Sequence, residues 1–269
     1  MRVVCVGDCG IDRYLPTGKH YVGGITANFA RHARSLFPAA DEIAVIAPLG
    51  NDPEATAVRS AFASSGIDCH FCELDGATPV QYINVREDGE KEFLRYEEGV
   101  LRNFELDAPE IELIADSDVL VAPAYLQIAR LFDGLMQIRT NGTICIDFAD
   151  FAQHPDFELL ERHLESIDVS FFGLSGNDEE TIEKLAAMAR AQDKLIVVTL
   201  GGGGSIAFQR KRRYEQQALP VDQVIDTTGA GDAYAAAFLS RYCHGAGINE
   251  AMAAGAARAA SVVQRPGAF

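Results

Sequence analysis

The sequence predicts an α/β protein in which a mostly parallel β-sheet is covered by helices on both faces. Along most of the 269 residues, short apolar segments typical of buried strands alternate with amphipathic segments typical of helices. Two other stretches break this alternation, and we expect them to form a small second sheet. This sheet would stand off the main body as a lid over the strand ends.

The strands of the main sheet are expected where apolar runs are short and bounded by polar or turn-forming residues. Such runs occur at residues 2–6, 43–47, 67–74, 118–122, 143–148, 169–172 and 194–200. Helices are expected between them, at 26–37 with Thr26 as a cap, at 53–65 with Asp52 as a cap, and at 179–192.

The lid is expected from two segments. Residues 80–86 and 91–96 alternate in period two around Asp88-Gly89, which is typical of a β-hairpin. Residues 12–22 are a polar excursion between the first strand and the first helix. We therefore place the lid at about 12–22 and 78–97. No linker or repeat divides the chain, so we expect a single domain over residues 1–269.

Composition excludes several classes of function. Lys and Arg total 23 against 39 Asp and Glu, which gives a net charge of -16. Such a field repels nucleic acid and anionic membranes, so we expect neither as a partner. Asp8 interrupts the first apolar run too soon for a signal peptide, and no run reaches the roughly 20 residues of a spanning helix. The six scattered cysteines are typical of reduced thiols, and we expect a cytoplasmic protein.

The strongest chemical signal is the segment 226–232, Asp-Thr-Thr-Gly-Ala-Gly-Asp, which precedes a helical run. Unpaired amides and the positive end of a helix dipole meet there, so the turn predicts an anion site. An acid in such a turn suits a base that accepts the proton of a hydroxyl attacking a phosphoryl group. Asp232 is that candidate base, with a capping acid as the alternative. The expected anion hole comprises the amides of Gly229, Ala230 and Gly231.

Other phosphate-binding fingerprints do not fit this chain. No P-loop sequence occurs. The two glycine-rich segments that could begin a dinucleotide-binding fingerprint have Tyr234 and Ile206 at the third glycine position, where a large side chain blocks close packing of helix on strand. Neither a P-loop nucleoside triphosphatase nor a dinucleotide-binding enzyme is supported.

Four segments together resemble signatures of the ribokinase-like (PfkB-type) carbohydrate kinases. Residues 226–232 match their C-terminal D-T-x-G-A-G-D turn, and residues 23–28 match their N-terminal pair of glycines followed by an asparagine. Residues 199–204 are similar to their nucleotide-binding strand end, and residues 177–180 to their N-x-x-E element. The matches follow the family order. The resemblance implies a three-layer ribokinase-like fold that phosphorylates a sugar with ATP.

The resemblance also implies roles for individual residues. Asp232 would be the catalytic base. The acceptor sugar would be held by Asp12, Gly24 and Asn28, since a carboxylate accepts hydrogen bonds and an amide both donates and accepts them. Asp8 and Arg95 are further candidates for binding the acceptor, with a turn-forming acid and a solvated arginine as the alternatives.

The remaining implied residues concern ATP and cations. Thr199, Gly201 and Gly204 would bind the nucleotide, while Asn177 and Glu180 would act on Mg²⁺ through water. Asp226 and Thr228 would border a site for K⁺. Relatives often continue past this site where the chain reads Gly267-Ala268-Phe269, so we expect the site to be incomplete, with Arg265 and Gly267 able to give backbone ligands.

One position departs from the family pattern. Asp147 ends a central strand, where ligands of open α/β sheets gather. Many sugar kinases carry an arginine shortly after this strand, where this chain has Phe151. The resemblance therefore supplies no phosphate-binding cation from that loop.

Within the family, the compact lid, residues 96–100 and the short ending are most similar to the fructoselysine 6-kinases. This likeness implies an acceptor phosphorylated on a primary hydroxyl, with Glu97 or Glu98 near its amino group. Kinases of ribose, fructose, a keto-deoxy sugar acid or a nucleoside are the alternatives, as is a non-catalytic sugar-binding protein. The presence of Asp232 favours the enzyme. The expected partners are a small sugar substrate and ATP, and the resemblance leaves room for a homodimer through the lid.

Overall fold

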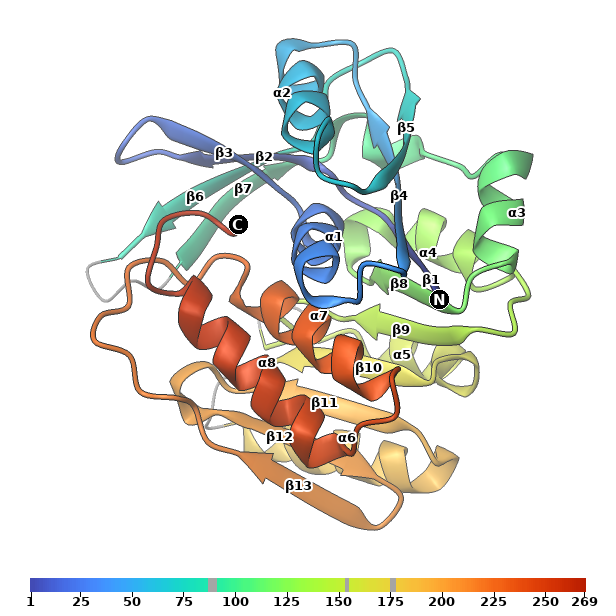
Figure 1. The fold of residues 1–269 in the computed structure, drawn as a ribbon, viewed down its shortest axis with the longest axis vertical. Helices are drawn as coiled ribbons and strands as arrows, with labels where there is room; N and C mark the ends of the chain where they lie inside the picture. Colours follow the sequence, from blue (N-terminus) through green and yellow to red (C-terminus); the bar gives the residue numbers. More distant parts are fainter. Residues whose placement is uncertain (87–90, 153–154, 175–177) are drawn as a thin grey trace.

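The computed structural model describes residues 1–86, 91–152, 155–174 and 178–269 (Figure 1). Its large sheet consists of β1 (Arg2–Val6), β4 (Glu42–Leu49), β5 (Asp68–Glu73), β8 (Val119–Pro123), β9 (Thr143–Asp147), β10 (Val169–Gly173), β11 (Leu195–Thr199), β12 (Ser205–Gln209) and β13 (Arg212–Gln216). In the described residues the order is β13-β12-β11-β10-β9-β8-β1-β4-β5. Neighbours from β5 to β11 pair in parallel, and β12 and β13 add an antiparallel edge.

Helices cover both faces of this sheet. One face packs against α1 (Ile25–Leu36), α2 (Pro53–Phe62), α7 (Ala230–Tyr242) and α8 (Ile248–Val262). The other packs against α3 (Ala108–Ala115), α4 (Ala129–Leu135), α5 (Phe157–His163) and α6 (Glu179–Gln192). Short 3-10 turns lie at η1 (Gly99–Asn103), η2 (Leu126–Ile128), η3 (Leu164–Ser166) and η4 (Gly201–Gly203). The expected layered α/β architecture is confirmed.

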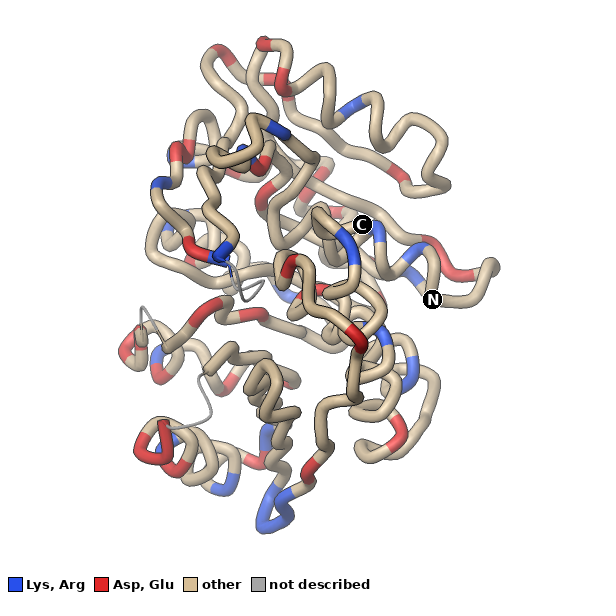
Figure 2. Tube along the Cα trace, turned by 90° about the vertical axis from the view of Figure 1, so that its left-hand side faces the viewer, with Lys and Arg blue, Asp and Glu red and all other residues tan. Residues whose placement is uncertain are grey.

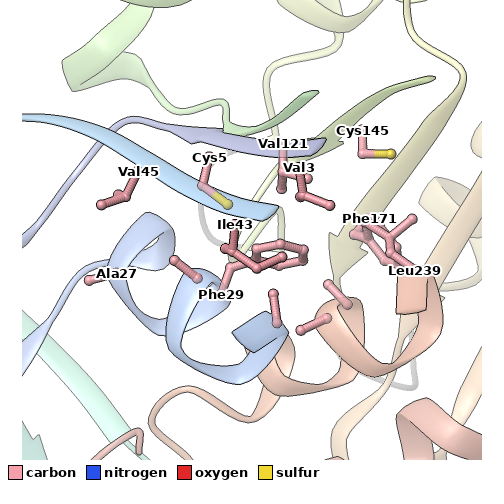
Figure 3. Close-up of a cluster of buried hydrophobic side chains, with 14 of the residues drawn as sticks. Val3, Cys5, Ala27, Phe29, Ile43, Val45, Val121, Cys145, Phe171 and Leu239 are labelled. Carbon is pink, nitrogen blue, oxygen red and sulfur yellow. The ribbon is translucent and has the colours of Figure 1, made fainter. Parts of the chain in front are cut away.

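The central strand β1 shows why its sequence is apolar at almost every position. Successive side chains of a strand point to opposite faces. Val3 and Cys5 join the core under α1 and α7, which Figure 3 shows, while Val4 and Val6 join the core on the opposite face. Burial on both faces is what a continuous apolar run provides.

A separate small sheet is formed by β2 (Gly10–Tyr14), β3 (Lys19–Gly23), β6 (Val80–Val85) and β7 (Lys91–Glu97), in the order β3-β2-β6-β7. The polar excursion thus contributes two strands, and β2 pairs in parallel with β6. β6 and β7 pair antiparallel as expected of a hairpin, while its turn at Asp88-Gly89 lies outside the described residues. In Figure 1 this sheet projects from the body beside α1.

Two local expectations needed correction. The first concerns α1, whose N-cap is Gly24 rather than Thr26, because a carboxylate from another segment binds the first amides of the helix. The second concerns α2, which ends at Phe62 rather than at residue 65. Its predicted cap is confirmed, since the Asp52 carboxylate accepts a hydrogen bond of 2.9 Å from the Ala55 amide.

Two further observations concern membrane-spanning helices and the state of the cysteines. No helix in the part of the chain that the structure describes combines the length and the apolar character needed to cross a bilayer. Cys5, Cys9 and Cys145 are buried free thiols, and Cys69, Cys72 and Cys243 are free thiols of intermediate exposure.

Candidate active site

A cavity of about 1060 Å³ opens between the small sheet and the carboxyl ends of the parallel strands, where open α/β sheets bind ligands. It brings together predicted residues from segments far apart in the sequence. They are Asp8, Asp12, Gly24, Asn28, Arg95, Thr199, Gly201, Gly204, Thr228, Gly229, Ala230, Gly231 and Asp232.

The N-terminal and C-terminal motifs meet in one hydrogen bond. Asn28 Nδ2 donates to Asp232 Oδ2 at 2.7 Å across 204 residues of sequence, and both side chains are buried. Asn28 Oδ1 finds no hydrogen-bond partner among the described residues. Since a buried polar atom is costly without a partner, this oxygen is an acceptor available to a ligand hydroxyl.

Asp232 lies in the first turn of α7, next to the open end of the helix. Burial and repulsion by Asp147 hold the pKa of Asp232 well above the ordinary carboxyl range, although the Asn28 hydrogen bond and Lys91 oppose this rise. A carboxyl group with a raised pKa is a stronger base once it is ionised, which suits it to take a proton from a hydroxyl.

Lys91 is a functional candidate that the sequence analysis did not identify. It begins β7 and lines the cavity, where its charge faces Asp12, Asp147 and Asp232. Its backbone amide donates to Thr227 Oγ1 at 3.3 Å, which ties the lid to the 226–232 turn. The available signal was a cation at the start of a predicted lid strand in a strongly acidic chain.

Asp147, at the end of β9, is a further carboxylate that lines the cavity. Its Oδ1 accepts a hydrogen bond of 2.8 Å from the Ala149 amide, and burial raises the pKa of Asp147 to about 6. Sequence reasoning placed Asp147 at the ligand-binding edge of the sheet, and it lines the cavity there. Its carboxylate acts electrostatically on Asp232.

Asp8 positions α1. Its carboxylate accepts hydrogen bonds from the amides of Ile25 at 3.0 Å and Thr26 at 3.1 Å, so it caps the helix that carries Asn28. Gly24 has a φ of 102°, and a Cβ there would lie 2.7 Å from the Asp8 carbonyl oxygen. Only glycine fits this turn.

Asp12 is buried on β2 and lines the cavity. Burial and repulsion by Asp8 raise the pKa of Asp12 to about 7. Gly23 on the adjacent strand makes room for it, because a Cβ at Gly23 would lie 2.2 Å from Asp12 Oδ2. Asp12 is thus a buried acceptor at the lid side of the cavity.

Two tyrosines also line the cavity. The hydroxyls of Tyr96 and Tyr125 lie 3.3 Å apart, and burial raises the pKa of both phenols. They come from the lid and from the body, so the pair bridges the two. Tyr96 adjoins Arg95 on the predicted hairpin, where the sequence suggested that both residues could face the substrate, whereas Tyr125 was not selected because it follows an ordinary strand and turn pattern.

The charged side chains at and just after the end of β7 contact other side chains of the protein. The Arg95 guanidinium lies 4.1 Å from the centre of the Tyr82 ring and 3.1 Å from Glu97, so this cation is engaged although Arg95 lines the cavity. Glu98 pairs with Arg102 at 3.1 Å. Glu97 and Glu98 are both described and neither lines the cavity, so the expectation that they meet an amino group has no geometric basis.

The 226–232 turn has the geometry of an anion site with one change. Gly229 has a φ of 75° and precedes α7, and a Cβ at Gly231 would meet open space. The Ala230 amide donates to the Thr227 carbonyl oxygen at 3.2 Å. The expected anion hole therefore narrows to the amides of Gly229 and Gly231, which point from the start of the helix.

The residues predicted to bind the nucleotide lie at the end of the cavity beyond β11. Thr199 ends this strand, Gly201 opens η4, and Gly204 has a φ of 90° where a Cβ would lie 2.2 Å from the Gln216 carbonyl oxygen. Apolar side chains continue the wall and suit a flat base. They are Leu219, Val221, Val224, Ala256, Ala259, Ala260 and Val263.

Of the predicted cation residues, Thr228 lines the cavity, whereas Asp226 and Glu180 do not. Glu180 is exposed in the first turn of α6, and Asn177 lies outside the described residues. Asp226 is buried behind the turn and accepts hydrogen bonds from protein groups. Within the described ranges, no three His, Cys, Asp or Glu side chains gather to hold a metal ion.

Comparison with known proteins finds similar kinases over nearly the whole length of this chain. Fructoselysine 6-kinase of Shigella flexneri is 30% identical over 98% of both chains, and fructosamine kinase FrlD of Bacillus subtilis (strain 168) is 27% identical over 100% of this chain and 93% of its own. Two solved structures share the fold at 21% identity. The adenosine kinase from Sinorhizobium meliloti has a TM-score of 0.81 and covers 99% of this chain and 95% of its own. Arabidopsis thaliana ribokinase complexed with ribose and ATP has a TM-score of 0.80, with coverages of 99% and 93%.

The family model described as "pfkB family carbohydrate kinase" matches residues 2–269. The D-T-x-G-A-G-D turn stands at the start of α7, and Asn28 donates a hydrogen bond to its last aspartate. Residues from two of the family-like segments therefore also meet in the cavity. The chain belongs to the pfkB family of carbohydrate kinases.

Proposed function

We propose that this carbohydrate kinase transfers the γ-phosphoryl group of ATP to the primary C6 hydroxyl of a fructosamine such as fructoselysine. The observation that carries the transfer is the buried Asn28–Asp232 pair beside the amides of the 226–232 turn. The choice of acceptor is supported by relatives named fructoselysine 6-kinase and fructosamine kinase, which match nearly the full length at 27% to 30% identity.

In this proposal Asp232 accepts the proton of the attacking hydroxyl, and Asn28 orients both groups. Its free Oδ1 accepts a hydrogen bond from a neighbouring sugar hydroxyl. The amides of Gly229 and Gly231 stabilise charge on the transferred phosphoryl group, as pre-positioned donors do in a site closed to water.

Lys91 supplies the cation that the loop after β9 lacks. Its position opposite Asp12, Asp147 and Asp232 supports this role, because a positive charge there would face the phosphoryl group as it passes from nucleotide to acceptor. Because Lys91 belongs to β7, this charge arrives with the lid, so closing the lid and completing the site become one event.

Mg²⁺ is expected to accompany ATP and to neutralise phosphate charge. Such ions keep several waters and need only one or two protein carboxylates. Asp147 is the carboxylate of the described cavity that fits this role, since it lies at the strand edge beside the anion-binding turn. Turnover is expected to stop in excess chelator and to return when Mg²⁺ is restored.

The acceptor end of the cavity supports a cationic, extended substrate. With Glu97 and Glu98 engaged elsewhere, the negative charge comes from Asp8 and Asp12, which face the lid side. Leu94 is 48% exposed and Leu126 is 77% exposed, and both line the cavity from opposite sides of the lid boundary. An aliphatic arm on the acceptor would cover this apolar surface.

A panel of acceptors tests the proposal by ADP release. Fructoselysine is expected to give a higher kcat/KM than free fructose, ribose or a nucleoside, and the product is expected to carry phosphate on C6. A free sugar or nucleoside that outperforms every glycated amino acid would contradict the acceptor and leave the kinase class untouched.

A further inference from the structure

Asp226 is a buried carboxylate whose oxygens are occupied by protein donors. Its Oδ1 accepts a hydrogen bond from the Thr228 amide at 2.9 Å. Its Oδ2 accepts two, from the Tyr14 hydroxyl at 2.7 Å and from the Gly267 amide at 2.8 Å. Asp226 itself is 1% exposed. The three donors come from the turn itself, the lid and the C-terminal tail.

The Tyr14 hydroxyl is a stable donor in this position. Tyr14 ends β2 and packs edge-on against the ring of Tyr21, with 5.3 Å between the ring centres. Burial and the neighbouring Asp226 keep the pKa of Tyr14 above its usual value, so the phenol stays protonated and donates to the carboxylate. Phenylalanine would fill the same space and donate nothing.

The Gly267 amide is held in place by α1 and α8. His32 Nε2 lies 3.0 Å from the Ala268 carbonyl oxygen, and its Nδ1 lies 2.9 Å from Arg258 Nη2. Since arginine only donates, Nδ1 must accept, and Nε2 carries the proton that binds the tail. Ala268 packs directly against Gly229, where an added Cβ would lie 2.4 Å from it.

This arrangement does not fit the monovalent cation that the family resemblance implies. A hard cation needs several oxygen atoms directed at one point. Around Asp226 the neighbours direct hydrogen atoms at the carboxylate instead, and Gly267, which the sequence offered as a backbone ligand, presents its N–H. Thr228 Oγ1 is the buried side-chain oxygen there without a hydrogen-bond partner among the described residues, and one side-chain oxygen does not build a coordination shell.

We propose that the Tyr14 hydroxyl and the Gly267 amide take the place of a monovalent cation at Asp226, so that phosphoryl transfer by this chain does not depend on K⁺. The donors balance the buried negative charge behind the anion-binding turn, and the tail and the lid hold that turn in its working shape. This inference rests on the kinase activity and is independent of which sugar accepts the phosphate.

The test compares the full chain in KCl and in tetramethylammonium chloride at equal ionic strength, with MgATP and fructoselysine. The wild-type kcat is expected to differ by less than about twofold between the salts, and the melting temperature of the unliganded protein is expected to be the same in both. The Tyr14→Phe variant is expected to lose about tenfold in tetramethylammonium, the effect of a lost hydrogen bond to a charged group. KCl is not expected to restore that loss, because the phenyl ring fills the space of the tyrosine and the Thr228 and Gly267 amides still point at the carboxylate.

Tyr21→Phe is the matched control, because it removes a hydroxyl from the same aromatic pair and leaves the Tyr14 donor in place. It is expected to behave as the wild type in both salts. A wild-type enzyme activated about tenfold or more by K⁺, or stabilised by K⁺ in the melting experiment, overturns the inference. So does a Tyr14→Phe variant that keeps the wild-type kcat in tetramethylammonium chloride.

The two proposals fail separately. If fructoselysine is not phosphorylated, the same salt comparison is run with the sugar of the panel that turns over fastest. The melting experiment needs no acceptor, and the wild-type comparison needs no variant, so neither depends on Tyr14→Phe folding.

Discussion

Asp232 is the residue whose substitution separates a catalytic base from a helix cap. Asp232→Asn keeps the shape of the turn and a partner for Asn28, and it removes only the proton acceptor and one negative charge. Turnover is expected to fall by roughly 10²–10⁴-fold, the usual contribution of a positioned base. ATP affinity is expected to stay the same or to tighten, because a charge that repels phosphate is lost. Calorimetry with ATP and ADP release on one preparation measure both.

Asp52→Asn is the matched control for this experiment. Asp52 is an aspartate that does cap a helix, since it accepts a hydrogen bond from the Ala55 amide in the first turn of α2, outside the cavity. It is expected to lose stability and keep its turnover. An Asp232→Asn enzyme that behaves in the same way, with near-wild-type kcat, would show that Asp232 is only a cap.

Asp147 and Lys91 set the pH at which Asp232 loses its proton. Since burial and Asp147 raise the pKa of Asp232, the base is protonated at low pH, and kcat is expected to rise with pH along an acidic limb above the ordinary carboxyl range. Asp147→Asn removes repulsion and is expected to move that limb to lower pH. Lys91→Met removes attraction and is expected to move it to higher pH, besides lowering kcat. A limb that shifts in the same direction for both variants would contradict this electrostatic assignment.

Residues with a local motif could be predicted from the sequence, and residues brought in by the fold could not. Asp232 and Asn28 stand in recognisable segments, so their candidacy preceded the structure. Tyr125 lines the cavity because it follows the end of β8, and nothing in its immediate sequence marks that outcome. Lys91 begins β7, and its charge in a predicted lid strand was a signal too weak to select it.

At the scale of elements, α1 depends on the turn that starts it. Gly24→Ala would place a Cβ 2.7 Å from the Asp8 carbonyl oxygen at a φ of 102°. We expect the helix start to shift, with a loss of about 1–3 kcal/mol in the free energy of unfolding and a lower kcat/KM as Asn28 leaves Asp232. Denaturant unfolding and ADP release measure the two effects.

Gly18→Ala isolates the backbone contribution. Gly18 also has a positive φ, 66°, but an added Cβ there meets nothing within 4 Å. It is expected to cost only the backbone strain and to leave kcat/KM close to that of the wild type. Equal effects from the two alanine variants would show that the contact with Asp8 does not matter.

Elements with strong local signals agreed with the structure, and those defined by distant partners did not. The runs of β1 and β10, the cap of α2 and the full extent of α6 were all predictable. The start of α1 was misjudged because its capping carboxylate comes from Asp8, on a separate segment. The edge strand β13 carries mostly polar side chains, so no apolar run announced it, and the three-residue apolar run of β12, at 206–208, was too short to be selected.

At the scale of the molecule, buried carboxylates make the unliganded protein sensitive to pH. Acidic positions are spread along the chain, as Figure 2 shows, but the effect comes from the few in the cavity. Asp12 has a pKa of about 7, raised from the ordinary carboxyl value, so its folded form binds protons that its unfolded form releases. The contribution of Asp12 to the free energy of unfolding is therefore present at low pH and is lost as pH rises through 7.

Between pH 6.5 and 8, we therefore expect the melting temperature of the unliganded protein to fall as pH rises. His32 has the opposite effect on stability, but only at lower pH. Because burial lowers the pKa of His32 to about 4, its contribution to the free energy of unfolding grows as pH rises from 4 and is complete above 6.5. The change is on the order of 1 kcal/mol, which scanning calorimetry resolves. Asp12→Asn is expected to flatten the dependence, and a melting temperature that rises over this range would contradict it.

The fold class could be predicted because periodic patterns and the order of four family-like segments agreed with each other. The identity of the acceptor could not be fixed in the same way. It depends on how the lid sheet approaches η2 and the end of β9, which sets what Leu94 and Leu126 leave open. Sequence patterns report which face of an element is buried, and they carry no measure of the space between two elements.

The packing of α1 against α7 has a consequence for how the chain is made. Phe29 of α1 lies in the same core as Leu239 of α7 and Phe171 of β10 (Figure 3). On a ribosome, β1 and α1 emerge first, and α7 and α8 emerge last. Until α7 and α8 arrive, α1 and α2 cover only part of that face of the sheet, and contacts between such distant segments are slow to form. We therefore expect the nascent chain to expose apolar surface, and with it a risk of aggregation, until α7 and α8 have been released.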